Sequence, residues 1–350
     1  MLGGAVFRHG RCGSTGPIRG GSVPAMRRLF LMIVAAAACG GSPKPTQLAP
    51  LPDDPKPASP PPAETKPAPP EPVAAKPPLG PPPPVEIKIS PPQTTVKIVS
   101  GGKGKKELVR YTAKSGVKQA IELAMDFMGK QDTDEQIIPT IVLTGEAETT
   151  AVDKDGTADY TVTITGMDAR PVTGSKVPVD KFKEVLGALT GLTVGGKLGK
   201  SGAAGDVTLR IEKPREHAAE TLELIRTTLP ALPVLPSEAV GVGAKWQATT
   251  AAKLADRLDV TLVTDYELVA HKGATWTIKG TTKVSGKDQE IESSKVSSIS
   301  GSGESELTIT DGALYPTYKS SLETQFTASV QDKSLQFLLR VGGAVTPKTP

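Results

Sequence analysis

Residues 141–166 read IVLTGEAETTAVDKDGTADYTVTITG, and this stretch decides what kind of fold the chain adopts. In its second half Tyr160, Val162 and Ile164 alternate with threonines, which places the apolar side chains on one face of a β-strand. The Asp-Gly pair at residues 155–156 is typical of a tight hairpin turn. The stretch therefore predicts two antiparallel strands joined by a short turn.

The same alternation recurs further along the chain. Residues 260–286, VTLVTDYELVAHKGATWTIKGTTKVSG, repeat the strand–turn–strand plan of residues 141–166, which indicates a faint internal repeat. Alternation of this kind is typical of antiparallel strands with one solvated face, and long strands in a twisted sheet curl. Other runs with the same period contain Ile121, Leu123, Met125 and Phe127; Val207, Leu209 and Ile211; and Leu335, Phe337, Leu339 and Val341.

Two helical patterns interrupt the strands. Over residues 179–190 and again over residues 215–229, apolar residues recur at helical spacing on one face. Each helix needs an apolar surface to cover, and a curled sheet offers one. The predicted fold is therefore α+β and mainly β: two related antiparallel curved sheets, half-barrel-like, with a few covering helices. The two halves span about residues 97–212 and 235–346, and helix 215–229 joins them.

A proline-rich stretch precedes the predicted β-rich domain. Residues 43–92 hold 21 of the 33 prolines in the chain. Proline lacks the backbone N–H that helices and sheets need and favours the extended polyproline II conformation, so no packed core is expected here. We therefore predict a disordered linker over residues 40–96, acting as a dispensable tether, and a β-rich globular domain over residues 97–346.

Residues 26–42 read MRRLFLMIVAAAACGGS and have the layout of a secretory signal. Two arginines precede an apolar run of about ten residues, too short to span a bilayer as a helix, and small residues follow. The run ends at Cys39, within an Ala-Ala-Ala-Cys sequence that resembles a lipobox. This predicts a signal peptide over residues 26–39 and lipidation of Cys39; the alternative is cleavage by an ordinary signal peptidase, with Cys39 incidental. Residues 1–25 lack periodicity, and we expect translation to begin at Met26.

These features predict a protein of the cell envelope that is held to a membrane by a lipid anchor. Gly40 follows the cysteine, where the enteric sorting rule has an aspartate for retention at the inner membrane. Resemblance to that rule therefore implies the outer membrane, with either the periplasmic or the surface face. Arg27 and Arg28 are also compatible with a twin-arginine export signal, but the residues around them favour general secretion.

The charge of the chain changes once the predicted signal is set aside. The full sequence has 41 basic and 37 acidic residues, but residues 1–39 hold five arginines and no acid. The remaining chain has 36 basic and 37 acidic residues, so no strong attraction to nucleic acid is expected. No cysteine follows Cys39, so the folded part must be held together by burial of apolar side chains rather than by disulfides.

The junction between the two predicted halves carries a recognisable pattern within residues 229–246, LPALPVLPSEAVGVGAKW. It resembles a group of uncharacterised bacterial envelope lipoproteins, and the resemblance covers about residues 105–335. It implies a domain and no particular activity. Residue by residue the expected role is structural, with Gly241 and Gly243 allowing a tight strand entry and Trp246 filling a core. The matching positions are Leu232, Pro233, Pro236, Val240, Gly243, Trp246 and Tyr266.

Candidate motifs for catalysis or metal binding lack required residues at the required spacing. His217 and His271 have no cysteine near them and form no zinc pattern. Residues 195–201, GGKLGKS, lack a glycine at the position that a phosphate-binding loop requires, so a flexible loop is expected. Residues 153–156, DKDG, begin like a calcium loop but lack its closing glutamate, which favours a hairpin turn. Glu304 and Glu306 share one face of a strand, which we expect to be solvated.

We therefore expect a non-enzymatic domain that serves as a structural or partner-binding module. The alternative is a carrier of an apolar ligand such as a lipid, because a curled sheet capped by helices can enclose an apolar cavity. The candidate ligand-lining residues are then Leu222, Ile225, Leu262 and Phe326. No catalytic residue, metal or cofactor is predicted. The expected partners are the membrane, through the anchor, and a protein or an apolar ligand, but no nucleic acid.

Overall fold

The computed structural model describes residues 82–348, apart from residues 230, 255–256, 292–293 and 331–332. The predicted signal peptide, Cys39 and most of the predicted linker lie outside the described residues. Within the described part, no helix has the length and apolar character needed to cross a membrane.

The described chain forms one continuous antiparallel sheet of 15 strands, with a separate two-stranded sheet beside it. This confirms the predicted mainly β, antiparallel fold with a few helices. The sheet has two wings, which are joined where β4 pairs with β17. Residues 97–100, which the prediction assigned to the first half, lie in β2 and pair with β11 in the second wing. The order of the strands along the sheet is β1-β9-β8-β7-β6-β4-β17-β16-β15-β13-β12-β11-β2, with β5 beside β4 and β14 beside β15.

The first wing consists of the strands from β1 to β4 in the order of the sheet. Its strands alternate between buried and exposed side chains, as the sequence period predicts. Hairpins connect β6 to β7 and β8 to β9. The bounds are β1 Val85–Ile89, β4 Lys118–Gln131, β5 Asp134–Ile137, β6 Thr140–Val152, β7 Ala158–Arg170, β8 Leu192–Leu198 and β9 Ala204–Ile211.

The second wing is built from the longest strands, several of them 14 to 17 residues. Strands β12, β13, β15, β16 and β17 pair with their neighbours over most of their length. The bounds are β2 Thr94–Ser100, β11 Lys245–Leu254, β12 Leu258–Lys272, β13 Thr275–Ser285, β14 Gln289–Ile291, β15 Ser294–Thr310, β16 Thr317–Val330 and β17 Lys333–Pro347; the separate sheet pairs β3 Lys103–Glu107 with β10 Val240–Val242.

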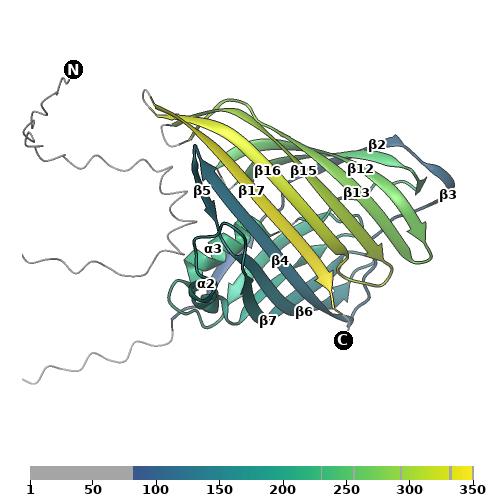
Figure 1. Cartoon of the computed structure of the whole chain (residues 1–350). Coiled ribbons are helices and arrows are strands. Elements are labelled where there is room, and N and C mark those ends of the chain that lie inside the picture. Colours follow the sequence, from purple (N-terminus) through teal and green to yellow (C-terminus); the bar gives the residue numbers. More distant parts are fainter. Residues whose placement is uncertain (1–81, 230, 255–256, 292–293, 331–332, 349–350) are drawn as a thin grey trace, which may run out of the picture.

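The sheet curls until its two edges come close together. Strands β1 and β2 form opposite edges of the sheet, yet only residues 90–93 connect Ile89 to Thr94. Five Cα-to-Cα steps of a fully extended chain span at most about 18 Å, so these two strand ends lie within that distance. The wings therefore bend towards each other around a concave inner side, as Figure 1 shows.

The folded chain begins at an earlier residue than the sequence indicated. The predicted linker ends at residue 96, but β1 and the first residues of β2 fall within it and belong to the sheet. Val85, Ile87 and Ile89 alternate with charged residues and pack against the core of the first wing. The prolines around this short run masked its alternation in the sequence.

Limited proteolysis of the full chain is expected to leave a resistant core that contains all of β1. The reason is that β1 pairs with β9 along its full length and covers apolar side chains. Mass spectrometry of the fragments measures the boundary. The variant Ile87→Asp is the control, since it places a charge against the core and should move the boundary beyond Ile89. A wild-type core that begins after Thr94 would contradict the placement of β1.

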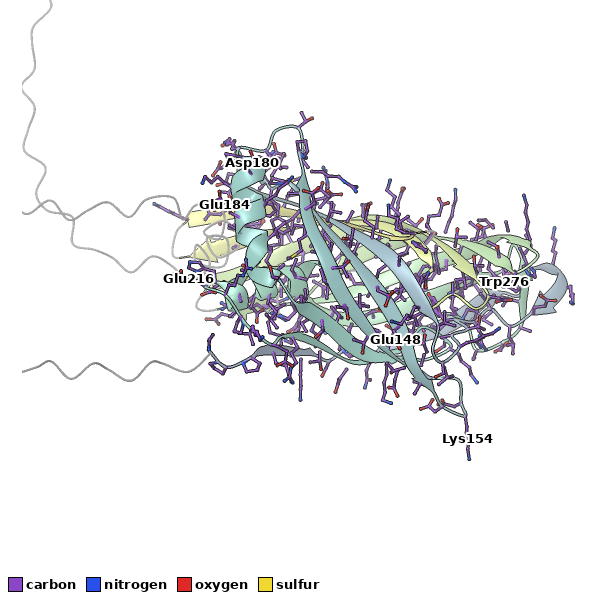
Figure 2. All side chains as sticks on the ribbon, turned by 90° about the horizontal axis from the view of Figure 1, so that it is seen from below. Glu148, Lys154, Asp180, Glu184, Glu216 and Trp276 are labelled. Atoms are coloured by element: carbon purple, nitrogen blue, oxygen red, sulfur yellow. The ribbon has the colours of Figure 1, made fainter. Side chains whose placement is uncertain are left out.

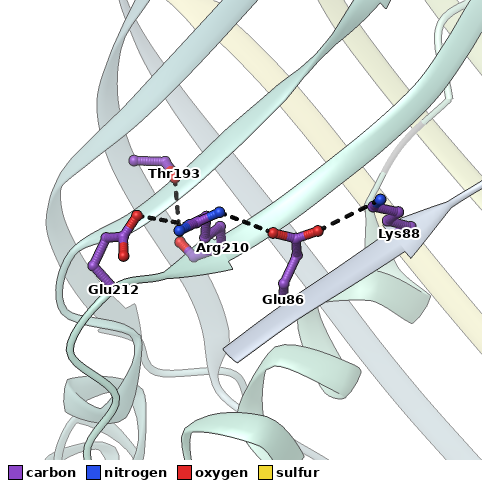
Figure 3. Close-up of polar contacts among 5 residues, drawn as sticks. All are labelled: Glu86, Lys88, Thr193, Arg210 and Glu212. Carbon is purple, nitrogen blue, oxygen red and sulfur yellow. Dashed lines mark hydrogen bonds and ion pairs between the residues drawn. The ribbon is translucent and has the colours of Figure 1, made fainter. Parts of the chain in front are cut away.

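A chain of charged side chains on the solvent face ties β1 to its neighbour (Figure 3). The Arg210 guanidinium contacts Glu86 at 3.1 Å and Glu212 at 2.7 Å, and Lys88 lies 3.8 Å from Glu86. Thr193 on β8 donates a hydrogen bond to the Arg210 carbonyl oxygen. Such exposed pairs add little stability, but charges along an edge strand discourage pairing with other chains.

Helices cover the concave side of the first wing. Helix α2, Val179–Leu186, continues into the 3₁₀ turn η1, Gly187–Leu189, and α3 spans Ala218–Thr228. Both helices confirm the predicted segments; α3 begins three residues later than expected, because a turn at residues 215–217 precedes it. Phe182 and Leu186 of α2 are buried against the sheet. The two helices lie together at one end of the molecule, as Figure 1 shows.

Candidate functional site

The four candidate ligand-lining residues do not meet in one cluster. Leu222 and Ile225 on α3 have no exposed surface and belong to the core between the helices and the first wing. Leu262 on β12 and Phe326 on β16 are partly buried and pack in a separate cluster within the second wing. The α3 residues therefore act as core residues in this structure.

Phe326 also borders a groove on the sheet with a volume of about 410 Å³. Polar side chains supply most of its lining, and Phe337, which stacks on Phe326 with ring centroids 5.2 Å apart, is among the apolar remainder. A groove of this polarity is a poor match for an apolar ligand. The lining residues are Lys130, Asp132, Ser298, Ser300, Gln325, Phe326, Thr327, Gln336, Phe337 and Leu338.

The pattern at the junction has the structural role that the sequence analysis expected. Trp246 is 1% exposed, stacks on Tyr266 with ring centroids 5.5 Å apart, and donates from its indole nitrogen to the Val234 carbonyl oxygen. The Tyr111 hydroxyl donates to the Pro233 carbonyl oxygen at 2.9 Å, and burial raises the pKa of Tyr111 well above its usual value. We call residues 231–239 the strap, because they run from α3 to β10 and pack into the second-wing core.

A tight backbone contact fixes β10 against β3. A side chain at Gly241 would overlap the Lys103 carbonyl group, so only glycine allows this approach. Gly243 has a φ of 79°, in the left-handed region that glycine adopts without strain. The prediction that these two glycines allow a tight strand entry is confirmed.

The other motifs behave as structural elements. Residues 153–156 form the predicted hairpin turn, in which the Gly156 N–H donates to the Asp153 carbonyl oxygen at 2.9 Å. The expectation of a flexible loop at residues 195–201 is wrong, since its first residues lie in β8 and the remainder forms a hydrogen-bonded turn into β9. Gly195 and Gly196 interrupt the alternation of apolar residues in β8, so the sequence did not indicate that strand. Glu304 and Glu306 are exposed on β15, as predicted.

The two histidines lie far apart in the fold. His217 precedes α3 with a φ of 61°, and His271 on β12 stacks on Trp276 with ring centroids 3.4 Å apart. Over the described ranges, no three His, Cys, Asp or Glu side chains gather in an arrangement that could hold a metal ion.

A different feature emerges at the end of the molecule where β2, β3, β10 and β12 meet. Val99, Leu108, Val242 and Val269 are the exposed large apolar residues in the described structure, with 36% to 65% of their surface accessible. Backbone hydrogen bonds join the segments that carry them: Gly241 N–H donates to Gly101, and Gly243 N–H donates to Leu268. Figure 1 shows β3 at the opposite end of the molecule from α2 and α3.

Two of the exposed valines lie at β-bulges. On β2, Ser100 and Ile98 pair with consecutive residues of β11, so Val99 between them is the extra residue. On β12, Leu268 and Ala270 pair with consecutive residues of β13, so Val269 is the extra residue there. Both valines lie in the exposed phase of their strands: Val99 shares its face with Lys97, and Val269 follows the buried Leu268.

Lysines surround these apolar side chains. Lys97, Lys103, Lys106 and Lys272 are exposed, and no ion pair joins any of them to a carboxylate in the described chain. We call these four lysines together with Val99, Leu108, Val242 and Val269 the basic tip.

Two lysines beside the basic tip do have acidic partners. Lys105 pairs with Glu107, which raises the pKa of Lys105 and lowers the pKa of Glu107 through their hydrogen bond. Lys245 lies 3.4 Å from Glu267. His271 contacts Glu107 at 3.7 Å, which brings the end of β12, and with it Lys272, beside β3.

The basic tip was not predicted from the sequence. Its signal is present in residues 97–110, KIVSGGKGKKELVR, which hold five basic residues and one acid. Two features hid it. The overall charge of the chain is balanced, and apolar residues in alternating strands were assigned to the core, whereas Val99 lies in the exposed phase of β2 with Lys97.

Comparison with known proteins gives one similarity. Residues 227–311 match a family described as a family of unknown function (DUF6263). The matched stretch contains the end of α3, the strap, β10 and the strands from β11 to β15. Neither the curated proteins nor the solved structures contain a significant match to this chain. Like the group that the junction pattern resembles, the matched family is uncharacterised, and its description assigns no activity.

Proposed function

We propose that this protein is a lipid-anchored envelope protein whose β-rich domain is non-enzymatic and binds a partner through the basic tip. One observation carries the proposal: the exposed apolar residues gather with unpaired lysines at one end, whereas the chain's own helices and strap pack on the concave side. Exposed apolar side chains that are clustered rather than scattered mark interaction surfaces.

The proposed anchor is a lipid on Cys39, at the end of an apolar run that is too short to span a bilayer. Between this cysteine and Val85 lie 45 residues rich in proline. An extended chain of that length reaches about 140 Å, which leaves the domain free to reach a partner away from its own anchor. The outer membrane is the proposed site of anchoring, since Gly40 follows the cysteine.

Replacing Cys39 with serine is expected to abolish incorporation of a fatty-acid analogue in cells, because the thiol is the acceptor of the lipid. The measurement is the labelling of the immunoprecipitated protein, together with its partition between membrane and soluble fractions. Ser42→Ala is the matched control, as it changes a hydroxyl-bearing residue three positions after the cysteine and should leave labelling intact. Equal labelling of the wild type and Cys39→Ser would rule out this anchor.

The alternative function, a carrier of an apolar ligand, draws support from the second-wing cluster alone. Leu262 and Phe326 remain partly accessible there, whereas Leu222 and Ile225 are packed in the core. Organic extraction of the protein purified from its native host distinguishes the two functions. A stoichiometric lipid in the extract would favour the carrier, and we expect an extract without one.

A further inference from the structure

We propose that the basic tip docks onto the surface of an anionic phospholipid bilayer. This inference rests on the proposed function, in which the basic tip is the binding surface, and it names the partner. Three observations lead to it: the local charge, the exposed apolar residues placed among the lysines, and the position of the basic tip relative to the start of the folded chain.

The charge of the basic tip differs from that of the rest of the chain. Residues 97–110 carry five basic residues against Glu107 alone, whereas the chain after Cys39 is close to neutral. Four exposed lysines, Lys97, Lys103, Lys106 and Lys272, contact no carboxylate within the described residues. A local cluster of positive charge attracts an anionic membrane over about a Debye length, even when the protein has little net charge.

The apolar residues of the basic tip suit shallow insertion between lipid headgroups. Val99 and Val269 project from β-bulges, and Leu108 directly follows β3. Lys97 lies two residues before Val99, Lys106 two before Leu108 and Lys272 three after Val269. The long lysine side chains can keep their charged ends at the headgroup level while their stems lie along apolar surface. An apolar residue in that setting is buried when the surface docks, which favours binding.

A bilayer fits this surface better than an acidic protein does. Lysine is depleted from the cores of protein–protein interfaces, where charged groups must be desolvated and fixed in one geometry. The four lysines here are spread over three segments, β2, β3 and the end of β12, and none is held by a carboxylate in the described structure. Clusters of flexible lysines beside exposed apolar residues are typical of membrane-surface recognition.

The arrangement of the domain leaves the basic tip free to reach such a surface. The folded chain begins at β1, which packs against α3, and α3 lies at the opposite end of the molecule from β3 (Figure 1). Figure 2 shows the same separation, with Trp276 far from Asp180, Glu184 and Glu216 of the helical region. The tether therefore joins the domain at one end, and the basic tip lies at the other. An anchored protein can thus present the basic tip to a bilayer.

The test uses the chain from Gly40 onwards, so that neither an acyl chain nor the apolar, arginine-bearing residues 1–39 contribute to binding. Sedimentation with vesicles of phosphatidylcholine containing phosphatidylglycerol, compared with vesicles of phosphatidylcholine alone, measures the partition coefficient. We expect binding to the anionic vesicles only, and we expect it to fall as salt increases. Replacing Lys97, Lys103, Lys106 and Lys272 with glutamine should lower the partition coefficient by more than about tenfold, since each lysine near an anionic surface contributes about fivefold.

A matched control removes four lysines from other surfaces. Lys154, Lys213, Lys319 and Lys333 are also exposed and also make no ion pair in the described structure, and Lys154 projects from the hairpin that joins β6 to β7 (Figure 2). Replacing these four with glutamine changes the net charge equally and should leave binding within about twofold of the parent. Equal losses in the two variants, or no binding of the parent to anionic vesicles, would overturn the proposal.

A second variant tests the apolar part. Val99→Ser with Val269→Ser should weaken vesicle binding several-fold at unchanged melting temperature, because both side chains are exposed in the free protein. Binding to immobilised polyglutamate that is as tight as vesicle binding, with both measurements insensitive to the valines, would show attraction to any acidic polymer and would contradict the bilayer. Failure of Cys39 labelling would remove the anchor and leave these results unaffected, so the two proposals fail separately.

Discussion

Replacing Trp246 with alanine is expected to lower the free energy of unfolding by about 3–5 kcal/mol, the typical cost of deleting a fully buried aromatic side chain. Trp246 is 1% exposed and is among the largest fully buried side chains in the described structure. The substitution removes its stacking on Tyr266 and leaves the Val234 carbonyl oxygen without its indole donor. It also opens a cavity where β2, β11 and the strap meet, because Ile98 lies opposite Trp246 across the ladder.

Urea unfolding of the full chain, followed by far-ultraviolet circular dichroism, measures this loss without relying on tryptophan fluorescence. Val99→Ala is the matched control, since Val99 neighbours Ile98 on the same strand but is 65% exposed, and it should shift stability by less than about 0.5 kcal/mol. Similar unfolding midpoints for Trp246→Ala and the wild type would mean that the strap does not pack on this residue as described.

The sequence predicts individual strands and helices well where the local period is strong. Tyr160, Val162 and Ile164 predicted β7, and the two helical patterns predicted α2 and α3. The single sheet could not be predicted in the same way. Its wings join through pairing of β4 with β17, in which Phe127 lies opposite Val341, and no local pattern specifies partners so far apart in sequence.

Prediction of the site failed for a related reason. Leu222 and Ile225 follow a helical period, whereas Leu262 and Phe326 lie in alternating strands. Neither period says which other elements a residue contacts, and the structure places the two pairs in separate clusters. Exposed apolar residues inside strands are harder still, because composition alone does not distinguish a valine in the exposed phase, such as Val99, from a valine in the core. Cys39, the predicted lipidation site, lies outside the described residues and remains a prediction from its flanking sequence.

Replacing Gly202 with alanine is expected to destabilise the fold by about 2–4 kcal/mol, through backbone strain and overpacking together. Gly202 has a φ of 86° in the turn between β8 and β9, and a Cβ there would overlap the Pro233 carbonyl oxygen and lie 2.6 Å from the Tyr111 ring. The strap is fixed at the same turn, since the Leu235 N–H donates to the Ser201 carbonyl oxygen at 2.7 Å. The added methyl group must therefore move the strap or the turn.

Gly191→Ala separates the two causes. Gly191 has a φ of 82°, close to that of Gly202, but a Cβ at that position meets no atom within 4 Å. Its substitution should cost about 1–2 kcal/mol, from the left-handed backbone alone. The difference in unfolding free energy between the two variants then measures the contact of the turn with the strap and Tyr111. Equal costs would mean that the strap yields freely at Gly202. A larger cost for Gly202→Ala would show that the strap links the turn of the first wing to the core around Trp246 in the second wing, because residues 233–235 contact both.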